Sequence, residues 1–519
     1  MENIFKSGND ESQVPYEEML KYGNLLKEMF KFNVDLFGKL YQNTSNYYKY
    51  NTMMFGKSLE NYNQYYRSKK DKEGTFPANG HDIYNHVARY GMSNSQIQAI
   101  MRLDERLDLD KLKRAVRLSV DAEPILKCRF VEDASPYWKP LENIGVIDFC
   151  CMEETDHADQ AIENFIKTPL DMNNDPMVKV KLIRSKQYDV LALKIDHACA
   201  DGAGAQEYIK LLADMYSKIS RENGTFTPEP RIAGRKDQDL LFAELGITNP
   251  DALFIPGSDI SIPMWSFPWE KGGSNTVCMS ICRLPGEQLD TMIKYAKSKG
   301  VTLNDLILTA YYRAMLVMGQ PVYGFPLEIP TTVDLRRYLP GHKTQAIRNF
   351  SGSEKTKLSM SINESFPKTL QRVADMMKEI KKGYPGLQSA IGLERIEKLD
   401  FRDTLGYYQA TQEARKITSF CPLYHGDKCV PTLSNIGYLS RSLIKFGSST
   451  VIDAYIVPPV VRPPGVLLMA NTYNSVLTLA IGYYQYTVER ENIEKLLNKI
   501  KDELIEGCKG VERSHVLQY

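Results

Sequence analysis

The sequence predicts an α/β protein made of two related halves, with a helical extension in front of them. The chain has 519 residues, whereas single hydrophobic cores stop growing at about 250–300 residues, so two globular units are expected. Stretches with strand periodicity and stretches with helix periodicity occur together in both units. This mixture favours two related sheets covered by helices.

The composition is that of an ordinary globular protein, with 43% hydrophobic residues, 25% charged residues and a formal net charge of +1. A nucleic-acid partner is not expected, because such proteins usually carry a basic excess. The nine cysteines include no C-x-x-C pair, so no metal site is predicted. Their irregular spacing fits reduced thiols. The polar N-terminus and the lack of a run of about 18 apolar residues add to the prediction of a cytoplasmic protein.

Residues 1–75 are expected to form the helical extension, because apolar residues recur at helical spacing around Leu25 and again around Leu36. Two roles stay open for this segment. It could pack on the body or on a partner chain, or its aromatic and Met-rich face could contact a membrane surface. The scarcity of clustered Lys and Arg residues argues against the membrane role.

The first half is assigned to residues 76–225. Periodicity predicts helices over 109–119 and 203–219, and strands over 124–132, 178–183 and 189–196. Residues 226–275 are rich in Pro, Gly and polar side chains and are predicted to be a crossover linker.

The second half is assigned to residues 276–519. Strands are predicted up to residue 284 and over 324–333 and 466–486, and helices over 286–298, 303–318 and 490–505. Asn304, at the start of the helix over 303–318, is expected to cap it.

The main candidate for chemistry is the loop between the strand over 189–196 and the helix over 203–219. It reads Asp196-His197-Ala198-Cys199-Ala200-Asp201-Gly202. An imidazole ordinarily titrates near neutrality, so His197 can take up and return a proton at pH 7. Small residues after it leave room for a substrate, Asp201 can fix the loop, and Gly202 permits an unusual backbone conformation. We therefore predict that His197 is a general base.

This loop resembles the HxxxDG motif of the CoA-dependent acyltransferase superfamily. That superfamily includes chloramphenicol acetyltransferase, the condensation domains of nonribosomal peptide synthetases, plant BAHD enzymes, alcohol acetyltransferases and bacterial wax ester synthases. Four further segments resemble family segments in the same order along the chain: Thr168-Pro169-Leu170-Asp171, Gly300-Val301-Thr302-Leu303-Asn304-Asp305, Val333-Asp334-Leu335-Arg336-Arg337 and Leu433-Ser434-Asn435-Ile436-Gly437. The resemblance covers residues 76–505.

The resemblance implies two chloramphenicol-acetyltransferase-like halves around a tunnel, with His197 midway along it. The acyl donor, acyl-CoA or an acyl-phosphopantetheine arm, would enter from one face and an alcohol or amine acceptor from the other. No permanently bound cofactor is implied. His197 would deprotonate the acceptor for direct attack on the thioester carbonyl.

The resemblance also assigns roles to residues around His197. Asp201 and Gly202 would be structural, with Arg336 as the ion-pair partner of Asp201. Ser434 and Asn435 would lie near the tunnel, where they could help to orient the developing oxyanion.

Two departures from relatives bear on the substrate. Peptide-forming condensation domains usually carry a second His where this chain has Asp196, and no DFGWG segment occurs near the C-terminus. The sequence therefore favours an O-acyltransferase similar to alcohol acetyltransferases. Two alternatives stay open: a non-catalytic binding or assembly protein on the same fold, and a condensation enzyme that uses carrier-protein thioesters.

Other chemical candidates are weaker. Cys199 could act as a nucleophile next to the imidazole, although two residues on one tight turn should point apart. His425 and Cys429 could be a fragment of a metal site, but two ligands alone are poor evidence. Cysteines 150 and 151 are expected in the core, and histidines 81 and 86 on the surface or in loops.

Overall fold

The computed structural model describes most of the chain from residue 74 to residue 509. The described ranges are 74–171, 175–221, 226–231, 237–255, 261, 265–270, 272–319, 326–359, 363–418 and 427–509. The chain divides into two units between Gly56 and Lys57, and every described residue belongs to the second unit. The predicted helical extension over residues 1–75 therefore lies outside the described residues, except for its last two.

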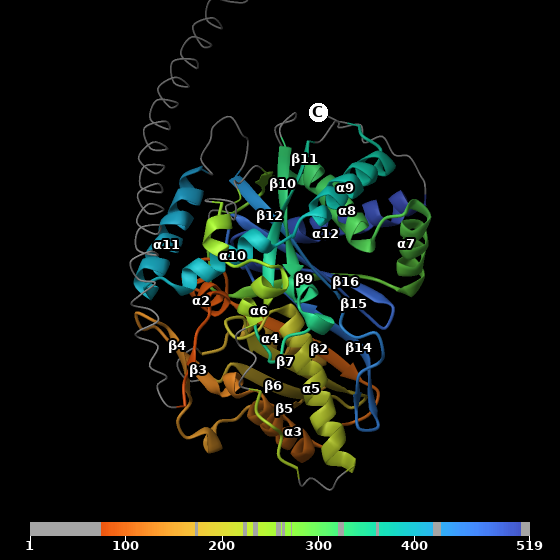
Figure 1. Ribbon diagram of the computed structural model, residues 1–519. Helices are drawn as coiled ribbons and strands as arrows, with labels where there is room; N and C mark the ends of the chain where they lie inside the picture. Colours follow the sequence, from red (N-terminus) through yellow and green to blue (C-terminus); the bar gives the residue numbers. More distant parts are fainter. Residues whose placement is uncertain are drawn as a thin grey trace, which may run out of the picture. The chain divides into compact units, whose positions relative to one another are not determined.

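The first sheet has six strands in the order β13-β14-β2-β7-β6-β5. They are β2 (Gln96–Leu103), β5 (Cys150–Glu154), β6 (Val178–Arg184), β7 (Asp189–Asp196), β13 (Lys445–Phe446) and β14 (Ser449–Val457). Helices α3 (Leu109–Ala122) and α5 (Gly202–Arg221) pack against each other beside this sheet, and α4 (Ala158–Lys167) contributes to its core (Figure 1). Every residue of β7 is buried, which places the strand before His197 in the middle of the core.

The second sheet has seven strands in the order β11-β10-β12-β15-β16-β9, with β8 paired to β12. They are β8 (Trp265–Phe267), β9 (Val277–Leu284), β10 (Pro326–Asp334), β11 (Ser351–Ser359), β12 (Asp427–Tyr438), β15 (Gly465–Tyr473) and β16 (Val476–Tyr484). Four helices share a hydrophobic core with this sheet: α7 (Gly286–Lys299), α8 (Leu303–Gly319), α9 (Phe366–Lys382) and α12 (Arg490–Cys508).

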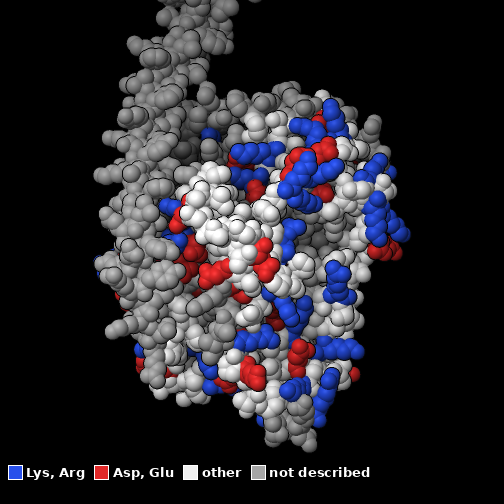
Figure 2. All heavy atoms as spheres, viewed as in Figure 1, with Lys and Arg blue, Asp and Glu red and all other residues white. Residues whose placement is uncertain are grey.

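Smaller elements complete the described unit. A three-stranded sheet has the order β1-β4-β3, with β1 (Phe76–Pro77), β3 (Cys128–Val131) and β4 (Tyr137–Pro140). The remaining helices are α2 (Gly80–Val87), α6 (Asp237–Glu244), α10 (Leu387–Glu397) and α11 (Phe401–Thr418), and the short 3-10 helices include η1 (Pro124–Lys127), η2 (Ile144–Val146), η4 (Pro250–Leu253), η5 (Leu335–Tyr338) and η6 (Pro340–His342). Basic and acidic side chains are mixed over the face shown in Figure 2, as the net charge of +1 suggests.

The two halves share a strand. β14 comes from the C-terminal half of the sequence, yet it pairs antiparallel with β2 of the first sheet, where Tyr455 lies opposite Ile100. One hydrophobic cluster also joins Val190 and Ala192 of β7 to Val277 and Tyr484 of the second sheet. Figure 1 shows β14 beside β2. The halves are therefore interlocked.

Most predicted elements are present, and the differences have local causes. The strand predicted over 124–132 begins as η1, because Pro124 fixes the first turn, and becomes extended only at Cys128. The run over 466–486 is the hairpin β15–β16, which turns at Asn474 and Ser475, both with positive φ. The crossover over 226–275 carries α6, η4 and β8. Within the described ranges, no helix is long and apolar enough to cross a membrane.

Candidate active site

His197 lies directly after β7, where the strand turns into the loop that leads to α5. Its backbone N–H donates to the carbonyl of Ser95, 2.7 Å away, which ties the loop to the start of β2. The residue is half-buried. Its Nδ1 lies 3.0 Å from Oδ1 of Asn349, whereas no described residue forms a hydrogen bond with Nε2.

Asn349 was not among the residues predicted for the site. It is fully buried and lies 152 positions from His197 in the sequence. Its Nδ2 donates to the carbonyl oxygens of His197 and Ala198, at 2.7 and 2.9 Å. A single side chain of the second half thus binds both the imidazole and the backbone of the loop.

Asp201 forms the ion pair with Arg336 that the resemblance implied. Arg336 Nη1 lies 2.9 Å from Oδ2, and Nη2 lies 3.1 Å from Oδ1, so the contact is bidentate. The carboxylate also accepts from the backbone N–H groups of Gly204 and Phe350, each at 2.7 Å. Asp201 therefore holds the first turn of α5 and the segment next to Asn349 together.

The charges around this pair shift several pKa values. Burial alone would raise the pKa of Asp201, but Arg336 and the backbone donors outweigh burial and hold this pKa below its usual range. Burial would lower the pKa of Arg336, yet Asp201, Asp334 and Glu207 keep it raised. Burial raises the pKa of Glu207 to about 7 even though Arg336 opposes the shift. The buried pair is consequently charged at neutral pH.

Asp196, at the position where peptide-forming relatives carry a second His, has a structural contact of its own. Its two carboxylate oxygens lie 3.2 Å from Nη2 of Arg89. One of them also accepts from the N–H of Ala198 at 2.8 Å. Arg89 was not predicted as a site residue, because nothing in the sequence near it points to the motif loop.

Gly202 contacts the second sheet. A Cβ atom at this position would lie 2.9 Å from Cγ2 of Ile436, so a side chain here would have to displace Ile436. The predicted segment around Ser434 and Asn435 therefore reaches the motif loop through Ile436. The Oγ of Ser434 accepts from Thr332 at 3.2 Å.

The side chain of Asn435 forms hydrogen bonds with neighbouring protein groups. Its Oδ1 accepts from the N–H of Gly437, and its Nδ2 donates to Oδ1 of Asn304, both at 3.1 Å. The prediction that Asn304 caps its helix is wrong. Thr302 and Asp305 exchange the capping bonds instead, at 2.8 and 3.2 Å, because Asn304 already lies inside the first turn of α8. The oxyanion role suggested for Ser434 and Asn435 stays a prediction.

The weaker chemical candidates are placed as follows. The thiol of Cys199 is buried and donates to the Asp196 carbonyl at 3.1 Å, away from the loop surface. Cys150 is buried but Cys151 is exposed, because neighbouring residues of an edge strand point to opposite faces. His425 lies outside the described residues. Among the residues the structure describes, no group of His, Cys, Asp and Glu could hold a metal ion.

The prediction that His81 and His86 lie on the surface or in loops is wrong, since both are buried on α2. His86 stacks on Phe130 with ring centroids 3.9 Å apart, and its Nε2 lies 2.6 Å from Glu132. His81 packs near Phe350, next to the site. The helix was missed because its buried face carries two histidines and an aspartate beside the aliphatic Ile83 and Val87, which weakens the apolar pattern.

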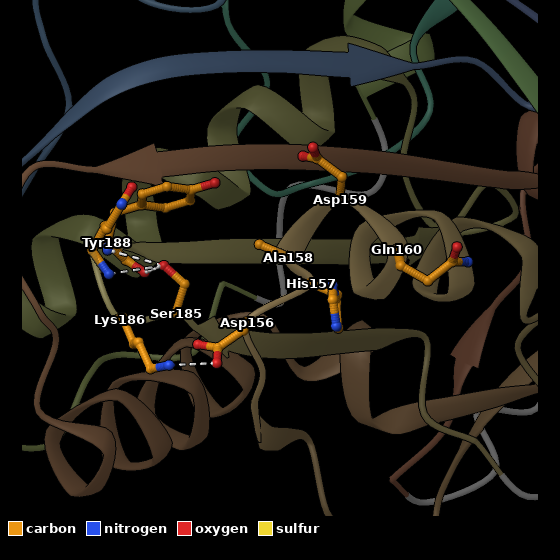
Figure 3. Close-up of a pocket in the computed structure, with 9 residues that line it drawn as sticks. Asp156, His157, Ala158, Asp159, Gln160, Ser185, Lys186 and Tyr188 are labelled. Atoms are coloured by element: carbon orange, nitrogen blue, oxygen red, sulfur yellow. Dashed lines mark hydrogen bonds and ion pairs between the residues drawn. The ribbon is translucent and has the colours of Figure 1, made fainter.

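Two surface pockets of the described unit lie elsewhere. One, of about 680 Å³, lies between the segment 156–160 and the turn 185–188 that joins β6 to β7. Figure 3 shows Lys186 and Asp156 paired across its wall, at 2.7 Å. This turn precedes β7 and His197 follows it, so the strand separates them by about 26 Å. A second pocket, of about 520 Å³, lies between α4 and the ends of β9 and β16. The tunnel at His197 stays a prediction.

Comparison with known proteins links the motif region to one family. Residues 88–233 match the family model of the condensation domain. Surfactin synthase subunit 2 of Bacillus subtilis is 26% identical over 168 residues, which are 31% of this chain and 4% of that protein. A plipastatin synthase protein of the same organism is 21% identical over 290 residues, 49% of this chain and 11% of that protein. The chain thus matches only a small part of each relative.

Solved structures match over much more of the chain. The first condensation domain of the CDA synthetase has a TM-score of 0.59 and 14% identity, covering 86% of this chain and 99% of that one. The trichothecene 15-O-acetyltransferase of Fusarium sporotrichioides has a TM-score of 0.61 and 13% identity, covering 83% and 95%. At this identity the likeness concerns the fold. The chain therefore has the two-lobed fold of the superfamily that unites condensation domains with CoA-dependent acyltransferases, as its HxxxDG loop predicted.

Proposed function

We propose that this protein is an acyltransferase that moves an acyl group from a thioester to an alcohol or amine, with His197 as the general base. The observation that carries the proposal is the state of the imidazole. Its Nδ1 is held by Asn349 at 3.0 Å, and its Nε2 is bound by no described residue. The residue is half-buried at the end of β7 and not fully enclosed, as access of a substrate to the ring requires.

The chemistry needs few groups. Nε2 takes the proton of the acceptor hydroxyl or amine as its oxygen or nitrogen attacks the thioester carbonyl carbon. The C–S bond then breaks, and the proton passes to the leaving thiolate. General-base help of this kind contributes about 10²–10⁴-fold. Holding donor and acceptor side by side adds a larger proximity effect.

For the donor we favour acyl-CoA and for the acceptor a hydroxyl group, which makes the protein a CoA-dependent O-acyltransferase. Asp196 supports this choice, because it replaces the extra His of peptide-forming domains and is paired with Arg89. A carrier-protein thioester is the second candidate donor. The match of residues 88–233 to the condensation-domain model favours it.

The experiment is to follow release of free thiol from a set of acyl-CoAs, with and without alcohols and amines. The same acceptors are offered acyl groups loaded on a carrier domain. We expect acceptor-dependent thiol release by the wild type and a loss of about 10²–10⁴-fold in His197→Ala, with an unchanged far-UV circular dichroism spectrum.

The matched control is His157→Ala, which removes an exposed histidine from the N-terminal end of α4. It should turn over like the wild type. Transfer from the carrier domain alone would replace CoA by a carrier protein as the donor. Absence of transfer from every donor, or full activity in His197→Ala, would contradict the proposal and favour a binding or assembly role on the same fold.

A further inference from the structure

Asn349 has two contacts with the motif loop that together define the direction of its amide group. Its Nδ2 donates to two backbone carbonyls, those of His197 and Ala198, at 2.7 and 2.9 Å. A carbonyl oxygen can only accept, so the NH₂ group must face the loop backbone. Oδ1 of the same amide then faces the imidazole.

This direction of the amide decides which ring nitrogen carries the proton. Oδ1 has no proton to give, so at 3.0 Å from Nδ1 it can form a hydrogen bond only if Nδ1 is the protonated nitrogen. The other tautomer would place two lone pairs against each other. Asn349 is fully buried, and an unmade hydrogen bond costs most where water cannot replace it.

The neighbours of Asn349 keep its backbone in place. The carbonyl of Arg348, just before it, accepts from Arg336 Nη2 at 2.9 Å. The N–H of Phe350, just after it, donates to Asp201 at 2.7 Å. The Asp201–Arg336 ion pair therefore fixes the backbone on both sides of Asn349. Through Asn349, the pair also acts on a ring that Asp201 itself does not touch.

We propose that Asn349 is a positioning residue that holds His197 in the tautomer with a proton on Nδ1 and a bare Nε2. This inference rests on the proposed function, since only a base needs its lone pair on the substrate side. It assigns to a residue outside the motif the task of keeping Nε2 ready to accept a proton. It also means that Asp201 and Arg336 influence the reaction indirectly, through the position of Asn349.

The test reads the tautomer directly, without substrate. The protein is labelled with ¹⁵N in its histidine rings, of which there are seven, and His197→Gln identifies the signals of residue 197. Above the pKa of the ring, the wild type should show a protonated Nδ1 and an unprotonated Nε2. Asn349→Leu, similar in size, should shift protonation toward Nε2 and lower kcat by about 10²-fold.

Asn349→Asp separates positioning from mere packing. Its carboxylate still accepts from Nδ1, so the tautomer should persist. The negative charge should raise the pKa of His197 and move the acid limb of kcat/KM to higher pH. A purely structural role would leave the tautomer of His197 unchanged in both Asn349→Leu and Asn349→Asp.

Asn471→Leu is the matched control. Asn471 is a buried amide that bonds both backbone groups of Ile456, at 3.2 and 2.8 Å. Its loss should lower the melting temperature as Asn349→Leu does, with the signals of His197 unmoved. A protonated Nε2 in the wild type, or an unchanged tautomer in Asn349→Leu, would overturn the inference. Either result can occur whether or not acyl transfer is found, so the two proposals fail independently.

Discussion

Arg336 and Asp201 are both almost fully buried, with side-chain exposures of 3% and 4%. Removal of one partner from a buried pair leaves an uncompensated charge, which costs about 3–5 kcal/mol. We therefore expect Arg336→Gln to lower the free energy of unfolding by that amount, measured by urea denaturation. Arg490→Gln is the control, because its pair with Glu494 is exposed and should contribute less than about 1 kcal/mol. Equal effects of the two changes would show that the buried pair does not hold the loop.

His81 adds a pH dependence to the stability of the same region. Burial, and then the charge of Arg348, lower the pKa of His81 from 6.5 to about 3, although Asp201 opposes the shift. Between these values the unfolded chain binds a proton that the folded chain does not. Stability is therefore lost as the pH falls below 6.5.

His81→Gln should remove this loss, because the new side chain does not ionise. One unit of pKa corresponds to 1.36 kcal/mol, so between pH 6.5 and 5 the wild type should lose about 2 kcal/mol more than the variant. Urea unfolding at the two pH values measures the difference. His157→Gln, at an exposed position, should keep the wild-type dependence. If the two variants behave alike, His81 is not buried in its neutral form.

Between elements, the start of α5 contacts β12 of the second sheet, where Gln206 donates to the carbonyl of Ile436 at 3.1 Å. Gly202→Ala would place a Cβ 2.9 Å from Cγ2 of Ile436, and overpacking of this kind costs about 1–3 kcal/mol. Ile436→Ala removes the clashing atom. The double variant should therefore be more stable than the sum of the single effects predicts, which urea denaturation of all four proteins measures.

Gly145→Ala serves as the reference for adding a methyl group, since no described atom lies within 4 Å of its Cβ position. It should change stability by less than about 0.5 kcal/mol. Strict additivity of Gly202→Ala and Ile436→Ala would mean that the loop does not rest on β12 in solution.

The elements that carry the motif could be predicted because their signals are local. β7 alternates apolar residues, α5 has an amphipathic face, and both agree with the predicted strand and helix within two residues at each end. Asn349 could not be found in this way. Its contact with His197 spans 152 positions, and nothing in the sequence around it differs from an ordinary loop.

At the scale of the molecule, β14 makes the first sheet depend on the second half of the sequence. Three tryptophans report on both parts: Trp138 in β4, and Trp265 and Trp269 in or beside β8. In Trp265→Phe/Trp269→Phe, the fluorescence of Trp138 should change at the same urea concentration as the far-UV circular dichroism. In Trp138→Phe, the fluorescence of Trp265 and Trp269 should likewise change at the same urea concentration as the far-UV circular dichroism, because interlocked halves unfold together.

Separate transitions in these variants would mean that the halves unfold independently.

The pairing of β14 with β2 could not be predicted from the sequence. Two strands more than 300 positions apart share no local pattern, and the periodicity of each is satisfied by many partners. The resemblance to known acyltransferases predicted the two halves, but not that β14 of the second half joins the sheet of the first.

The exchanged strand also limits how such chains can be recombined. A chimera that took residues 276–519 from a relative would receive a foreign β14 between β13 and β2, and with it a mismatched ladder inside the sheet that carries His197. Residues 445–457 would have to be inherited together with the N-terminal half. Joining two parent sequences at the linker near the midpoint would therefore combine strands of both parents in the first sheet, although the linker looks like a natural boundary.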